Sequence, residues 1–320
     1  MDFDPRDRDG DVRGLEIQWV ELPGPGPDRR DADDVRGRDD DTRDRDQPDR
    51  DSGDPRDVFV AGLDLPRGSE REIVLDGSYR YELNGDDSRT LATIGAFRVV
   101  AERDLRESRG ESDTREPDLR HLRDHGLIAS VRLEGRERVL TLTARGRLLL
   151  DAHRRDGHDD AHQAFQAGVS RARELSHDAQ LYRAYVREYE RLREQGADIR
   201  RVVLDGDLKR EYQEWLQASN RGRPDSDGRP DRDAREVQQW AREHDLPYFD
   251  EQVHFPDFRI EYELEGRDRH EDVEVVTEHY RGAHARSVAK TGFRCYGRGS
   301  GGGRGGGRGF DPGVAEDLLC

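Results

Sequence analysis

Two carboxylates near the end of this 320-residue chain lie in a segment that reads as a β-hairpin. The segment HFPDFRIEYELEGRDRHEDVEVVTEHY (254–280) alternates apolar and charged residues, which predicts two strands joined at the charged EGRDRHE stretch. Pairing about residues 267 and 268 places acids opposite each other on one face: Glu261 with Glu274, and Asp257 with Glu278. Carboxylates placed in this way repel unless Arg259 or a divalent cation such as Mg²⁺ lies between them.

A lysine follows this hairpin in a chain that otherwise uses arginine. Of 55 basic residues only Lys209 and Lys290 are lysines, which leaves 55 − 2 = 53 arginines. A helix from about Ala283 is predicted to bring Lys290 to the start of a further strand, GFRCY (292–296). The plain alternative is an ordinary surface lysine, and acids on one face of a hairpin are often only solvated, because 40% of the chain is charged.

The order of the elements around these residues resembles a nuclease superfamily. A long helix, a strand, a Pro-Asp strand, a Glu-bearing strand, a helix and a strand resemble the restriction-endonuclease-like, or PD-(D/E)xK, core. The resemblance implies that Asp257 and Glu274 are catalytic residues that hold a metal, with Mg²⁺ as the cofactor. Val276 occupies the position of the superfamily's lysine, so the resemblance makes Lys290 the replacement, which would orient the attacking water or contact the scissile phosphate.

A second set of elements precedes this region. Apolar spacing predicts a helix over 87–105 with Ser88 as its cap, then a short helix containing Leu119 and Leu122 that stops at Gly126. The stretches LIASVRL (127–133) and RVLTLT (138–143) predict a hairpin, and a closing helix starts at Ala144. Helices followed by a hairpin and then by a closing helix, in this order, predict a winged-helix arrangement.

The predicted winged helix is locally basic in an acidic chain. Residues 117–147 hold seven arginines and four acids, a net charge of 7 − 4 = +3, whereas the whole chain carries −17. A helix and an arginine-bearing hairpin of this kind suit the major groove and the backbone of double-stranded DNA. The predicted DNA contacts are Arg120, Arg123, Arg132, Arg136 and Arg138. A winged helix that contacts only proteins is the alternative.

Residues 58–296 as a whole resemble the replication-relaxation family of plasmid and mobile-element proteins. The stretches that carry the resemblance are IGAFRVV (94–100), LTARG (142–146) and VEVV followed by Lys290 and Tyr296. The resemblance implies a DNA-binding protein that acts in replication or mobilisation of a plasmid or integrated element. An active metal-dependent endonuclease or nickase is one alternative, and an RNA-associated protein that works through a Gly-Arg segment is another.

Composition divides the chain into four parts with an α+β fold in the middle. The predicted parts are an acidic tail (1–57), a winged-helix domain (58–155), an α/β restriction-endonuclease-like domain (156–296), and a Gly/Arg-rich linker with a terminal helix (297–320). The tail carries 11 arginines and 20 acids, a net charge of 11 − 20 = −9, and is predicted to be disordered. Within it, GLEIQWVELPGPG (14–26) alternates Leu15, Ile17 and Trp19 like a short strand, so it is either a docking peptide or a transient apolar cluster.

Several classes of protein are disfavoured. Cys295 and Cys320 are 25 residues apart, which supports neither a zinc cluster nor a disulfide framework. No apolar run approaches 18 residues and the N-terminus is acidic, so the expected location is the cytoplasm, without membrane contact. The stretches GHDD (157–160) and SHDA (176–179) imitate paired His-Asp metal sites, but such pairs are common where helices begin. A homodimer would suit a two-fold DNA site, although the sequence shows no dimer seam.

Overall fold

The structure, a computed structural model, has an α+β fold, which confirms the predicted class. It describes residues 53–107, 119–133, 137–155, 162–169, 174–220, 232–276 and 290–297. The predictions for most of the acidic tail, for Arg136, for Glu278, for the helix from Ala283 and for residues 298–320 lie outside these ranges. In the described part of the chain, no helix is both long enough and apolar enough to cross a membrane.

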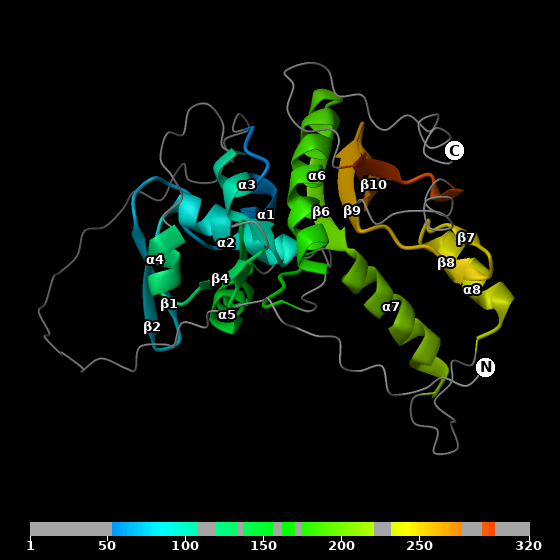
Figure 1. Ribbon diagram of the computed structural model, residues 1–320, viewed down its shortest axis with the longest axis horizontal. Coiled ribbons are helices and arrows are strands. Elements are labelled where there is room, and N and C mark those ends of the chain that lie inside the picture. The colour runs from blue at the N-terminus through cyan, green and yellow to red at the C-terminus, as the bar shows by residue number, and fades with distance from the viewer. Residues whose placement is uncertain are drawn as a thin grey trace, which may run out of the picture.

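The N-terminal half combines small helices with two small sheets (Figure 1). Its elements are α1 (Asp57–Val60), β1 (Glu72–Asp76), β2 (Tyr79–Leu83), α2 (Gly85–Phe97), β3 (Val100–Ala101), α3 (Glu102–Glu107), α4 (Leu119–Asp124), β4 (Ile128–Arg132), β5 (Arg138–Leu142) and α5 (Ala144–Ala152). β1 and β2 form a separate antiparallel ribbon, while β3, β5 and β4 form a three-stranded sheet in that order. The fold begins before the predicted boundary, because Arg56 is buried and pairs with Asp54 and Asp86.

The helix predicted over 87–105 is divided into three elements. α2 starts two residues earlier, at Gly85, after a capping box in which the Asn84 side chain accepts from the backbone amide of Asp87 and the Asp87 side chain accepts from the backbone amide of Asn84. Ser88 is therefore not the cap, and its hydroxyl donates to the Asn84 carbonyl instead. α2 ends because Arg98 adopts a left-handed φ of 65°, after which the chain enters β3 and α3.

The C-terminal half is built on a four-stranded mixed sheet. Its elements are α6 (Leu175–Glu194), β6 (Asp198–Leu204), α7 (Asp205–Gln217), a 3₁₀ turn (Ala218–Asn220), α8 (Ala234–Glu243), β7 (Tyr248–Phe249), β8 (Gln252–Val253), β9 (Phe258–Leu264), β10 (Arg267–Val276) and β11 (Arg294–Gly297). The strand order is β11-β10-β9-β6, with β11 parallel to β10 and the other pairs antiparallel. β6 is at the edge of this sheet. The side-chain amide of Gln163 donates to the carbonyl of Val202 and accepts from its amide, so it pairs the backbone groups of one residue at that edge.

The register of the β9–β10 hairpin differs from the prediction. Leu264 pairs with Arg267, so the turn consists of Glu265 and Gly266, both with positive φ, rather than residues 267 and 268. Such a two-residue loop matches the twist of the flanking strands. Glu261 consequently lies opposite His270, and the predicted pair of Glu261 with Glu274 is wrong.

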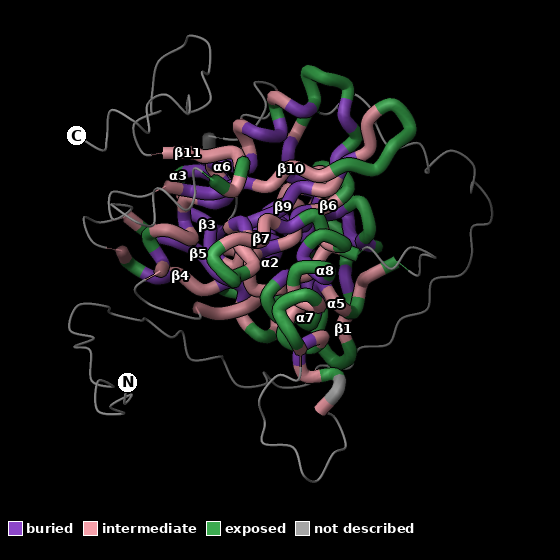
Figure 2. Tube along the Cα trace, turned by 90° about the vertical axis from the view of Figure 1, so that its right-hand side faces the viewer, coloured by how far each residue is buried: buried purple, intermediate pink, exposed green. Residues whose placement is uncertain are grey.

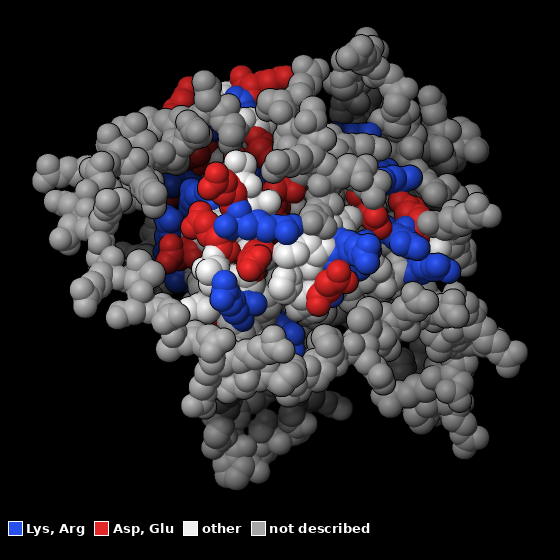
Figure 3. All heavy atoms as spheres, turned by 90° about the vertical axis from the view of Figure 1, so that its left-hand side faces the viewer, with Lys and Arg blue, Asp and Glu red and all other residues white. Residues whose placement is uncertain are grey.

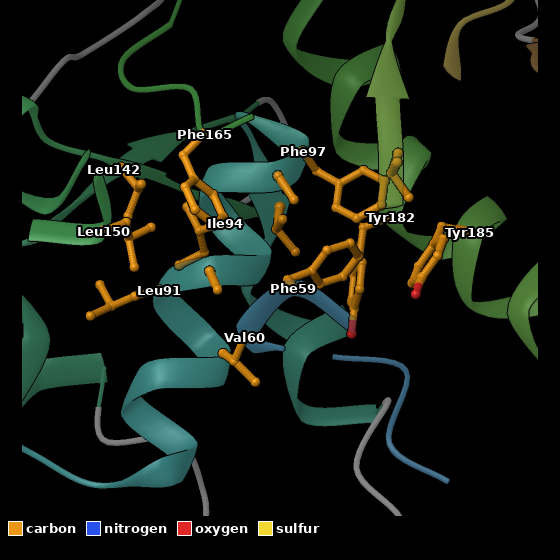
Figure 4. Packing of buried hydrophobic residues seen from close by; sticks show 14 of the residues in the cluster. Phe59, Val60, Leu91, Ile94, Phe97, Leu142, Leu150, Phe165, Tyr182 and Tyr185 are labelled. Carbon is orange, nitrogen blue, oxygen red and sulfur yellow. The ribbon is translucent and has the colours of Figure 1, made fainter. Parts of the chain in front are cut away.

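One apolar core joins the two halves. α6 lies between them, against the C-terminal sheet on one side and the N-terminal half on the other (Figure 1). The ring of Phe97 on α2 packs edge-on against Tyr182 of α6 and Phe258 of β9, with centroids 5.4 and 6.1 Å apart. Figure 4 shows Phe97, Tyr182 and Tyr185 converging with Phe59, and Figure 2 shows the buried residues in the interior. The halves therefore share buried surface.

Candidate functional site

Asp257 lies where three elements of the C-terminal half meet, immediately before β9. One carboxylate oxygen, Oδ2, accepts from the backbone amide of Val275 at 2.7 Å and lies 3.0 Å from Nε2 of His177. Its backbone carbonyl accepts from the amide of Asp205, the first residue of α7, at 3.0 Å. The side chain of Asp257 thus accepts a backbone hydrogen bond from β10 just before β9 begins, and its contact with His177 connects this part of β10 to α6.

His177, near the start of α6, supplies the positive charge beside Asp257. Its second ring nitrogen, Nδ1, lies 3.5 Å from a carboxylate oxygen of Asp178. Burial alone would lower the pKa of His177, but the hydrogen bonds and charges of Asp178 and Asp257 outweigh this and raise the pKa to about 10. His177 is therefore an imidazolium held between two carboxylates near neutral pH. The SHDA stretch was the only sequence signal for this residue, and its aspartate does contact the imidazole.

Glu274 is buried on β10, with 6% of its surface exposed. It pairs in register with Cys295 of β11. Burial, together with the negative charges of Glu274 and Asp257, raises the pKa of the Cys295 thiol to about 11. Both predicted carboxylates therefore act on the same thiol, and the structure does bring Asp257 and Glu274 to one end of the sheet.

Lys290 is not part of this group. Its side chain is 62% exposed and its ammonium forms an ion pair with Asp250, 3.8 Å from Oδ2, in the β7–β8 turn. The ammonium also lies 5.6 Å from the ring centroid of Phe249. The contacts of Lys290 in the structure are therefore with the β7–β8 turn, and its role as a catalytic residue stays a prediction.

Arg259 does not bridge the carboxylates either. It is 8% exposed and binds Asp272 through two hydrogen bonds of 2.7 and 2.9 Å. Its remaining donors reach the carbonyls of His244 and Asp245 at the end of α8. Arg259 therefore fastens α8 to the sheet.

The arrangement fits a magnesium ion poorly. Magnesium requires an octahedral set of oxygen ligands, and the Oδ2 atom of Asp257 is already engaged by an imidazolium and a backbone amide. Among the described residues, no group of three or more His, Cys, Asp or Glu side chains is placed to hold a metal ion. The geometry gives Asp257 a structural task, because its carboxylate links β10 to α6.

A buried ionic cluster lies on the other face of the sheet, under α6. Glu188 is fully buried and contacts Arg191, Arg294 and the hydroxyl of Tyr296. Arg191 and Arg294 also contact Glu271 of β10. Burial, followed by the hydrogen bond and charge of Glu188, raises the pKa of Tyr296. The cluster holds the edge strand β11 against α6, and the apolar spacing of α6 alone gave no sign of its charged partners.

The predicted DNA-contacting arginines occupy different environments. Arg120 is 89% exposed and lies 3.7 Å from Asp124, while Arg123 is largely buried and lies 3.6 Å from Glu102. Arg132 and Arg138 are exposed and directly opposite each other in the β4–β5 ladder. The described part of the face shown in Figure 3 carries basic and acidic side chains side by side. Arg132 and Arg138 thus form a pair of exposed basic residues beside the hairpin loop.

Comparison with known proteins does not place the chain in a family. No family model, no curated protein and no solved structure matches it.

Proposed function

We propose that the protein binds double-stranded DNA through α4 and the β4–β5 hairpin, used as the recognition helix and wing of a winged-helix unit. The observation that carries the proposal is the cross-strand pair of Arg132 and Arg138. Like charges directly opposite each other on a ladder destabilise it, and neither arginine has an ion pair with a described acid. A phosphate between the two guanidinium groups would relieve this repulsion.

The order of elements supports the same proposal. α2, β3, α3, α4, β4, β5 and α5 follow one another, and β3 joins the hairpin strands in one sheet. This order brings α4 directly before the hairpin, with Arg120 exposed on it. A helix and a hairpin presented together suit the groove and the backbone of DNA, respectively. Together with the resemblance of the sequence to the replication-relaxation family, this favours a role in replication or mobilisation of a plasmid or integrated element.

In this proposal the C-terminal half is a scaffold that does not cut DNA. Asp257 is held by His177 and Val275, and Lys290 is turned to Asp250. Two of the three predicted catalytic residues, Asp257 and Lys290, therefore have other partners. The four-stranded sheet supports α6, which carries the apolar core shared with the N-terminal half.

The salt dependence of DNA binding tests the proposal. Log affinity falls as log salt concentration rises. We expect that replacing both Arg132 and Arg138 by alanine makes this negative slope shallower by about two, because two phosphate contacts are lost. The measurement is fluorescence anisotropy with a labelled DNA duplex at several salt concentrations. Arg242→Ala is the matched control, because Arg242 is exposed on α8, in the other half. Equal slopes for the wild type and the double variant would contradict the proposed contact.

A metal-dependent endonuclease is the second candidate, favoured by the hydrogen bond from the amide of Val275 to Asp257, which places that carboxylate beside the residue that follows Glu274. The scaffold role predicts that purified protein leaves supercoiled plasmid intact with either Mg²⁺ or Mn²⁺. Gel electrophoresis over time would check this, beside Glu274→Gln and Lys290→Ala. Nicked or linear product that requires metal and disappears in both variants would instead establish the endonuclease. The variant Lys209→Ala is the control, since Lys209 is an exposed lysine paired with Asp205 on α7.

A further inference from the structure

Exposed apolar side chains gather on the β1–β2 ribbon and the neighbouring face of α5. Ile73 and Leu75 on β1 are 55% and 63% exposed, and Tyr79 on β2 is 48% exposed. Leu148 of α5 is 56% exposed and lines, with Tyr79, a groove that runs along the turn of the ribbon. The ladder register divides these side chains between the two faces of the ribbon: Ile73 and Leu75 share one face, while Tyr79 lies on the other face beside Leu148.

The two β1 residues lie on the outer face of the ribbon. Val74, between them, is 6% exposed and belongs to the core. Because side chains alternate along a strand, Ile73 and Leu75 both point away from that core. They are therefore available as a pair of aliphatic side chains, two residues apart, on a ribbon with nothing described above it.

The outer edge of β1 also offers backbone groups. The ribbon contains two strands, so β2 is the only described strand beside β1. The carbonyl of Leu75 accepts from Nε2 of His153 at 3.1 Å, which shows that it points away from β2. In an antiparallel ladder, backbone groups two residues apart point to the same edge, so the amide and carbonyl of Ile73 point outward as well. Because His153 already engages the carbonyl of Leu75, the part of this edge that can pair with a further strand is centred on Ile73.

We propose that residues 15–20 of this same chain, LEIQWV, add as a strand to the outer edge of β1. Leu15, Ile17 and Trp19 repeat every second residue, which is the spacing of Ile73 and Leu75, so the two apolar rows meet on one face. The sequence contains no proline within 15–20, and Pro23 follows shortly after, where a strand would end.

The connecting chain is long enough for this pairing. The described structure begins at Gly53, and the 33 residues from Val20 to that point span up to about 110 Å when extended. A connection of this length allows the segment to return to a strand that begins only 19 residues after Gly53.

A second copy of the chain fits the same edge less well. Antiparallel pairing of the whole of β1 with itself about Val74 would place Glu72 opposite Asp76 twice. Acids directly opposite each other destabilise a ladder. The segment 15–20 brings one acid, Glu16, and no such symmetric repulsion.

Hydrogen–deuterium exchange of the full chain tests the proposal through two segments at once. We expect the amides of residues 15–20, and those of 73–75, to exchange at least roughly tenfold more slowly than in a variant that cannot pair. Leu75→Asp should release the amides of 15–20, and Trp19→Asp should release those of 73–75. Ser78→Asp is the matched control, because it adds the same charge at the exposed turn of the ribbon, away from the β1 edge.

Three results would overturn the proposal. The first is exchange of residues 15–20 at the rate of an unprotected peptide in the wild-type chain. The second is protection of 15–20 that survives Leu75→Asp, which would place the segment elsewhere. The third is protection of 73–75 that grows with protein concentration while 15–20 exchange freely, which would assign the edge to a second copy. Slow exchange in α2 of every variant would show that the fold is intact.

Discussion

Replacing Glu188 by alanine is expected to lower the free energy of unfolding by about 3 kcal/mol, because one member of a buried ionic cluster is removed. Glu188 has no exposed surface, and it contacts Arg191, Arg294 and the hydroxyl of Tyr296. After the substitution the two guanidinium groups keep only Glu271 among these carboxylates. The uncompensated charge, and the cavity left by the side chain, both favour the unfolded chain.

Glu190→Ala is the matched control for this prediction. Glu190 is on the same helix, two residues away, and its side chain is exposed, so its removal should change stability by less than about 0.5 kcal/mol. Urea denaturation followed by circular dichroism would measure both variants. Similar values for the two substitutions would show that the cluster does not hold β11 to α6. Tyr296→Phe should cost about 1 kcal/mol, since it removes a single hydrogen bond to the carboxylate.

Local patterns in the sequence predicted many of the elements. The alternation between residues 258 and 276 predicted β9 and β10, and the apolar runs near 127 and 138 predicted β4 and β5. The register of β9 and β10 was missed because the charged stretch EGRDRHE hides which two residues turn. Gly266 was the available signal, since a positive φ is easiest at glycine.

The end of α2 had no comparable signal. The chain leaves the helix at Arg98, a residue type that seldom takes a positive φ, and neither glycine nor proline marks the position. Packing explains the break better than propensity does. Val100 is fully buried and pairs with Leu140 in the three-stranded sheet, so tertiary contacts pull the residues after Phe97 into a strand.

The candidate site was predictable only in part, because its decisive contacts are distant in the sequence. Asp257 and Glu274 could be identified from their strands, and the carboxylate of Asp257 accepts from the amide of Val275, the residue after Glu274. The contact of Asp257 with His177 spans 80 residues, and no spacing rule reveals it. Lys290 was assigned to the site because of its rarity, but its neighbour in space is Asp250. The residue types suggested a metal-dependent site, whereas the contacts in the structure show that Asp257 lies beside His177 and Lys290 beside Asp250.

The contribution of His177 to stability should depend on pH. Burial would lower its pKa, but the hydrogen bonds and charges of Asp178 and Asp257 raise it to about 10 in the folded protein. In the unfolded chain the pKa of histidine is about 6.5. The folded value is the higher one, so the stabilisation is fully present below about pH 6.5 and is lost as the pH rises toward about 10.

His177→Gln measures this contribution. Glutamine keeps a hydrogen-bond donor but has no charge, so we expect the variant to be about 2–3 kcal/mol less stable than the wild type near pH 6, with the difference shrinking strongly by about pH 10. His162→Gln is the control, because it makes the same substitution at an exposed histidine outside α6. Urea denaturation of all three proteins across this range provides the comparison. A difference that stays constant with pH would mean that His177 is neutral, and that Asp257 and Asp178 lie together without the cation that the geometry places between them.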